Sequence, residues 1–186
     1  MPWLQLIHEL EIDAEQYVAE GFQRHIVAPG ICPHCDCADA LWALGYYVRN
    51  LTRLGAGFLR IVIRRFRCRV CGKTISILPS FAQPYRLIQN ETIEKFAGGD
   101  HDDPGVLRWT DLLRRYWQRF VLWVPEMEHV MECVANRSPP HEPMQWWDLM
   151  LRHYGDLASA TQASVSVFRI TFFGRYRCHF PNPPAD

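Results

Sequence analysis

Positions 41–78 are rich in aromatic and aliphatic residues, and turn signals divide this part of the chain into three segments. Residues 41–54 and 58–68 flank Gly55-Ala56-Gly57, which is typical of a hairpin turn. Residues 74–78 form a third, shorter segment rich in Ile and Leu. The pattern predicts three antiparallel strands.

After Pro84 the spacing of apolar residues becomes helical. Residues 85–97 favour a short helix and residues 98–105 a loop. Between 106 and 124 the apolar residues share one face of a helix; they are Trp109, Leu112, Leu113, Tyr116, Trp117, Phe120 and Trp123. Because proline favours the first turn of a helix, Pro125 predicts that a separate helix begins there.

Capping signals predict further helices at both ends of the chain. Asp13, with Gln16 three residues on, fits a capping box, and Gly155 and Asp156 separate a helix over 143–154 from one over 157–163. Residues 164–180 fit either a strand or a helix. A helix-turn-helix over 156–171 is one alternative, and a helix followed by an aromatic-rich strand is the other.

Four cysteines bracket the predicted strands. Cys32-Pro33-His34-Cys35 precedes them, and Cys68-Arg69-Val70-Cys71 follows the second. Each C-x-x-C pair can wrap a turn around one metal ion, and four thiolates make a structural zinc site. Gly72 suits the reversal after the second pair, because glycine adopts positive φ readily. We therefore predict Zn²⁺ bound by Cys32, Cys35, Cys68 and Cys71.

Other interpretations of the cysteines stay open. Iron in a rubredoxin-like site and reduced cysteines in a core are the two alternatives to zinc. Cys37 is a fifth nearby thiol and His34 lies inside the first pair, but C-x-x-C already closes the turn, so we expect neither to be a ligand. The chain is then α+β, a small antiparallel β zinc ribbon followed by an α-helical region. The predicted parts are a helical N-terminal segment (1–27), the ribbon (28–84), the helical domain (85–180) and a disordered tail (181–186).

The charge distribution is uneven although the net charge is zero. Residues 1–39 carry seven acids and one Arg, whereas residues 40–90 carry eight Arg, one Lys and no acid. A positive block in a neutral protein suggests an anionic partner. The candidate phosphate contacts are Arg49, Arg53, Arg60, Arg64, Arg65, Arg67, Arg69 and Lys73. Alternatively, these cations pair with the N-terminal acids Glu9, Glu11, Asp13, Glu15 and Glu20.

Residues 28–90 resemble the zinc-ribbon segments of bacterial insertion-sequence and transposon-associated proteins. Besides the first cysteine pair, the resemblance rests on residues 45–49, 65–74 with the second pair, 78–81 and 84–85. It implies a zinc-binding, DNA-associated module. A transposase or a second copy of the chain is a further candidate partner, bound through the helical half. Asp36 and Cys37 depart from the usual pattern after the first pair.

Catalysis by this chain is not expected. No nucleophile motif, glycine-rich phosphate loop or H-E-x-x-H motif is present, and the region after residue 90 has too few strands for an RNase H-like sheet. No run of apolar residues is long enough to span a membrane, and residues 1–30 do not resemble a signal peptide, so we expect a cytoplasmic protein. The alternative function is a protein-interaction module in which zinc only stabilises the fold.

Overall fold

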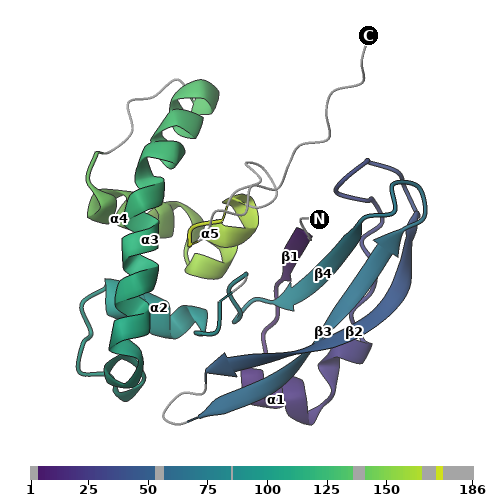
Figure 1. The fold of residues 1–186 in the computed structure, drawn as a ribbon, viewed down its shortest axis with the longest axis horizontal. Helices are drawn as coiled ribbons and strands as arrows, with labels where there is room; N and C mark the ends of the chain where they lie inside the picture. The colour runs from purple at the N-terminus through teal and green to yellow at the C-terminus, as the bar shows by residue number, and fades with distance from the viewer. Residues whose placement is uncertain (1–3, 53–56, 85, 136–140, 165–170, 174–186) are drawn as a thin grey trace.

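The fold is given by a computed structural model that describes residues 4–52, 57–84, 86–135, 141–164 and 171–173. A β-sheet and a group of helices lie side by side in it (Figure 1). The α+β class expected from the sequence is confirmed. The predicted turn at 55–57, the residues 165–170 of the helix-turn-helix alternative and the tail 181–186 lie wholly or largely outside the described residues.

The sheet has four strands in the order β1-β4-β3-β2. The three predicted strands form an antiparallel meander of β2 (Leu41–Thr52), β3 (Phe58–Cys68) and β4 (Thr74–Pro79). The prediction of a purely antiparallel ribbon is wrong, because β1 (Leu4–His8) pairs in parallel with β4. This pairing buries Leu4 completely and covers the open edge of β4.

The N-terminal helix α1 (Ala14–Ala19) packs against the sheet. Asp13 and Gln16 form the predicted capping box. Tyr17 is fully buried, and its hydroxyl donates a hydrogen bond to the Val62 carbonyl at 2.8 Å. Gly21 ends the helix in the left-handed conformation before a short 3-10 helix, η1 (Phe22–Arg24). Residues 4–26 thus contribute to the core of the ribbon.

The second half contains α2 (Asn90–Ala97), α3 (Pro104–Ala135), α4 (Pro143–Tyr154) and α5 (Leu157–Ala163). The prediction that a new helix begins at Pro125 is wrong, because α3 continues through it. Proline removes one helical hydrogen bond. Pro125 is exposed, so water can satisfy the carbonyl left unpaired.

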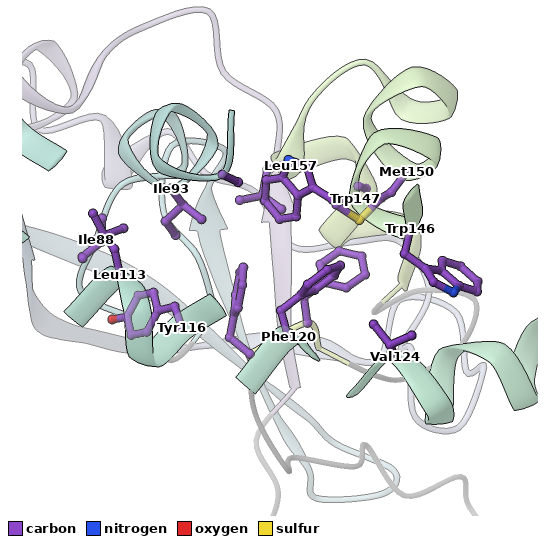
Figure 2. Close-up of a cluster of buried hydrophobic side chains, with 14 of the residues drawn as sticks. Ile88, Ile93, Leu113, Tyr116, Phe120, Val124, Trp146, Trp147, Met150 and Leu157 are labelled. Atoms are coloured by element: carbon purple, nitrogen blue, oxygen red, sulfur yellow. The ribbon is translucent and has the colours of Figure 1, made fainter. Parts of the chain in front are cut away.

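The apolar stripe of α3 faces a helical core, as the sequence predicted. Phe120 is fully buried and packs edge-on against Trp147 of α4, with ring centroids 5.4 Å apart (Figure 2). Leu113 and Tyr116 are buried beside it, whereas Trp117 is only partly buried against the same cluster. Aromatic rings from α3 and α4 therefore form the centre of this half.

Polar contacts join the sheet to the helices. The backbone N–H of Ile7 in β1 donates to the Gln162 side chain at 2.8 Å, and the Gln83 side chain donates to Thr161 at the same distance. Gln89 donates through Nε2 to the carbonyl of Thr52 at 2.7 Å. The strand β1, which periodicity did not predict, is thus one of the links between the two halves.

Candidate metal centre

Two chain reversals with the same backbone pattern hold the cysteine pairs. In the first, Cys32 N–H donates to the Cys37 carbonyl at 3.0 Å, and Asp36 N–H donates to the Cys32 carbonyl at 2.9 Å. In the second, Cys68 N–H donates to the Lys73 carbonyl at 2.9 Å, and Gly72 N–H donates to the Cys68 carbonyl at 3.0 Å. The two reversals are therefore equivalent, residue for residue.

The fifth position of each reversal has a left-handed backbone. Gly72 has a φ of 67°, as the sequence analysis expected, and Asp36 occupies the matching place with a φ of 57°. Asp is among the few non-glycine residues that tolerate this conformation. The departure from the usual ribbon pattern at Asp36 is thus compatible with the fold.

Four sulfur atoms meet between the reversals. The Sγ atoms of Cys32, Cys35, Cys68 and Cys71 all lie within 4.8 Å of one another. Cys35 Sγ is 3.6 Å from Cys68 Sγ, and Cys32 Sγ is 3.9 Å from Cys71 Sγ. Tetrahedral zinc with Zn–S bonds of about 2.3 Å places its sulfurs about 3.8 Å apart. The cluster is therefore consistent with a metal ion such as zinc.

The four clustered thiols differ in burial, and Cys32 and Cys68 have pKa values shifted in opposite directions. Cys32 and Cys68 are buried, whereas Cys35 and Cys71 are partly exposed. The backbone N–H groups of Cys71 and Val70 lower the pKa of Cys68 to about 6. Burial raises the pKa of Cys32 to about 12. A bound cation favours the thiolate at every ligand, so the protons of these thiols would leave when metal binds.

Cys37 and His34 stand outside this group of four. Cys37 occupies in its reversal the position that Lys73 occupies in the other. Its thiol therefore lies just after the first C-x-x-C pair and, unlike the four clustered thiols, has no cysteine at the equivalent position of the other reversal. The group is the one potential metal-ligand cluster among the residues that the structure describes.

The cations of the ribbon differ in exposure. Four are exposed on β3 and in the second reversal: Arg60, Arg67, Arg69 and Lys73. Arg64 and Arg65 are half-buried, and Arg53 lies outside the described residues. Arg49 is also half-buried, and its Nη2 donates a hydrogen bond to the Gln83 carbonyl. Burial lowers the pKa of Arg49. Arg49 therefore differs from the exposed cations, because its guanidinium group is half-buried and bonded within the protein.

One feature of the ribbon was missed in the sequence. The pairing of β2 with β3 shifts by one residue between Ala43 and Gly45, which leaves Leu44 as a bulge. Gly45 has a φ of 131°. A glycine within an apolar strand is the signal that could have predicted it, because glycine in a strand often marks a bulge.

Helices long and apolar enough to cross a membrane are absent from the described residues.

No curated protein and no solved structure matches the chain. Residues 32–115 match the profile of a family described as a domain of unknown function (DUF6431). The matched segment begins at the first clustered cysteine and ends within α3, so it covers the whole metal centre and part of the helical half. The description names no activity and supplies no link to transposition. This segment, which carries the four-cysteine cluster, is thus similar to a domain of unknown function.

Proposed function

We propose that this protein binds nucleic acid, most simply DNA, through exposed cations of a ribbon held together by Zn²⁺. The metal would have a structural role, because four cysteines leave no open coordination position for a substrate. Binding rather than catalysis is the proposed activity of the chain. The resemblance of residues 28–90 to insertion-sequence ribbons makes DNA of a mobile element the target we propose.

The observation that carries this proposal is the exposure of four cations, Arg60, Arg67, Arg69 and Lys73. All four lie within residues 40–90, a block of the sequence that contains no acidic residue. The N-terminal acids had offered an internal partner for these cations. Among the described residues, no ion pair joins Glu9, Glu11 or Glu20 to any of the four. A Zn²⁺ ion with four thiolates would carry about −2, so the block would keep a charge of about +7. Guanidinium groups bind phosphate oxygens bidentately.

The salt dependence of binding tests the proposal. If the exposed and half-buried cations neutralise about six phosphates, log K should fall against log salt with a slope of about −5 on duplex DNA and about −4 on a single strand. The affinity of the zinc-loaded full chain can be measured by fluorescence anisotropy from about 50 mM salt upward. Because phosphate contacts carry no sequence information, unrelated sequences should bind with similar affinity.

A pair of variants with equal charge locates the contact. Replacing Arg67, Arg69 and Lys73 by Ala should flatten the slope, while zinc content stays the same. Replacing three exposed arginines of the helical half, Arg114, Arg119 and Arg152, by Ala removes the same charge elsewhere and should leave most of the slope. Failure of the unmodified protein to bind single-stranded or duplex nucleic acid at about 50 mM salt would reject the proposal.

A protein-interaction module is the second candidate. Ile31 beside the first reversal is 59% exposed and Val70 within the second is 66% exposed. Two exposed aliphatic residues at the metal end of the ribbon favour a protein contact more than a phosphate contact. A chain that binds no nucleic acid but self-associates through Ile31 and Val70 would support this candidate.

A further inference from the structure

The bulge at Leu44 changes which residues of β2 share a face with β3. Ala43 pairs with Phe66 and Gly45 with Arg65, so β2 has one residue more than β3 over this stretch. The partner β3 continues without a break. Side chains of β3 therefore alternate regularly between the two faces, while those of β2 change phase at the bulge.

Two aromatic residues of β2 consequently lie on opposite faces. Trp42 pairs with Arg67, and Tyr46 pairs with Arg64. Arg64 and Arg67 are three residues apart in β3 and so point to opposite sides of the sheet. Each of the two pairs combines one aromatic ring with one guanidinium group, which makes them a natural comparison within the molecule.

At the metal end of the sheet, the pair of Tyr46 and Arg64 lies on the face that carries the apolar core, although the Tyr46 side chain is itself 45% exposed. The Arg64 guanidinium is 4.4 Å from the Tyr46 ring centroid and 5.3 Å from that of Phe66. Phe66 is buried and belongs to the same apolar cluster as Ile75, its partner in β4. Arg64 is thus engaged with the rings beside it.

The pair of Trp42 and Arg67 lies on a polar face. Arg67 pairs with Thr74 and Arg65 with Ser76, so Thr74 and Ser76 lie on this side. We call the surface formed by Trp42, Tyr47, Arg65 and Arg67 the polar face. Here the Arg65 guanidinium is 5.8 Å from the Tyr47 ring centroid. At this end of the sheet the apolar core lies on the other side, whereas further along β3 the fully buried core residues Ile61 and Ile63 lie on the same side as Arg65 and Arg67.

Trp42 and Arg67 are exposed on the polar face, and Arg67 is held there by a hydrogen bond. Trp42 is 40% exposed on β2, the outer strand of the described sheet. Arg67 Nε donates a hydrogen bond to the Gly72 carbonyl at 3.1 Å, which ties the guanidinium to the second reversal. Arg69 and Lys73 add two exposed cations in that reversal. A large accessible ring thus stands beside positioned positive charge.

We propose that the nucleic acid bound by this protein is single-stranded and lies across the polar face, with a base stacked on Trp42 and phosphates held by Arg67 and its neighbours. This inference rests on the proposed function. Proteins that bind single strands combine a cationic track with aromatic side chains on which bases stack. In a duplex the bases are stacked on one another, so the Trp42 ring would gain no such contact.

The test compares two double variants that lose the same groups on opposite faces. One replaces Trp42 and Arg67 by Ala, and the other replaces Tyr46 and Arg64 by Ala. Each loses one ring and one charge. The probe is a labelled oligonucleotide of about 20 nucleotides, free or annealed to its complement, bound to the zinc-loaded full chain.

The unmodified protein should bind the single strand more tightly than the duplex. The variant lacking Trp42 and Arg67 should lose at least about tenfold in affinity for the single strand, and its log–log salt slope should be shallower by about 0.7. The variant lacking Tyr46 and Arg64 loses one half-buried cation of the ribbon but keeps Trp42, so it should lose much less affinity for the single strand and should still prefer it to the duplex. Zinc content and the melting curve establish that each variant is folded.

The outcomes separate this inference from the function on which it rests. Equal losses in both variants, or tighter binding of the duplex, would reject the polar face while leaving nucleic-acid binding intact. If the unmodified protein binds neither the single strand nor the duplex, the proposed function itself is rejected. If loss of Arg64 from its aromatic neighbours prevents folding, Arg119→Ala serves as the control, because Arg119 is exposed on α3 and its loss removes one charge outside the ribbon. A loss with Arg119→Ala as large as with Arg67→Ala would then overturn the inference.

Discussion

The Sγ atoms of Cys35 and Cys68 lie 3.6 Å apart, although the residues are 33 positions apart in the chain. Strands β2 and β3 span this separation, and Leu41 at the start of β2 pairs with Cys68 at the end of β3. The cysteine cluster therefore closes the open end of a long hairpin. A metal ion at this point would stabilise the register of the two strands as well as the reversals.

We predict one Zn²⁺ per chain. The variant with Cys68→Ser and Cys71→Ser should lose the metal, whereas Cys37→Ser should keep it, because Cys37 stands outside the group of four. Elemental analysis of the purified proteins measures both. Chelation should also lower the melting temperature of the unmodified protein, since the binding energy of a structural metal is largely folding energy. Loss of zinc from Cys37→Ser would contradict the ligand set.

Asp103 is predicted to stabilise the start of α3. Its Oδ1 accepts hydrogen bonds from the N–H groups of Gly105 and Val106 at 2.8 and 3.2 Å, and Lys95 Nζ donates to Oδ2 at 2.9 Å. Asp103→Ala leaves the N–H groups at the helix start without this partner. A melting curve should show a lower midpoint for Asp103→Ala and no change for the exposed neighbour Asp102→Ala.

The same residue gives a pH dependence with a definite sign. Hydrogen bonding to Lys95 lowers the pKa of Asp103 in the folded protein. A carboxyl whose pKa is lower when folded stabilises the fold above its unfolded pKa of about 3.9 and loses that effect as the pH falls through the folded value. The difference in midpoint between Asp103→Ala and the unmodified protein should therefore shrink at acidic pH. A constant difference from neutral to acidic pH would contradict this assignment.

Much of the ribbon and of the metal centre was predictable because the signals are local. Each C-x-x-C pair, Gly72 and the three apolar segments specify their own structure over a few residues. Strand β1 could not be predicted in this way, since Leu4–His8 is short and its partner β4 is some 70 residues away. Its conformation follows from the open edge of β4, a tertiary feature.

Two further differences have physical causes that spacing alone does not reveal. Pro125 lies inside α3 because the helix is anchored on both sides, by Phe120 and Val124 before the proline and by Met127 after it. The bulge at Leu44 places Trp42 on the face of Arg67, whereas strict alternation along β2 would place it with Tyr46. In both cases burial and pairing outweigh the local rule.

Tyr17→Phe should isolate one polar contact between α1 and the sheet. The Tyr17 hydroxyl donates to the Val62 carbonyl at 2.8 Å from a fully buried side chain. The substitution keeps the ring and removes the donor, so it should lower the free energy of unfolding by about 1 kcal/mol. Denaturant titration measures the change. Tyr46→Phe, at an exposed ring, is the control, and an equal effect of both would contradict a specific role for the buried hydroxyl.

Phe120→Ala should be among the most destabilising substitutions in the helical half. Phe120 is fully buried against Trp147, Trp117 and Phe172, so a smaller side chain leaves a cavity that the surrounding rings cannot fill (Figure 2). The expected loss in the free energy of unfolding is about 3–5 kcal/mol. Leu122→Ala, on the same helix but 77% exposed, should change it by no more than about 0.5 kcal/mol. Zinc content should stay at one ion per chain in both variants, because the cysteine cluster draws none of its ligands from α3. A small loss for Phe120→Ala, or loss of zinc from it, would show that the aromatic cluster is not an independent core.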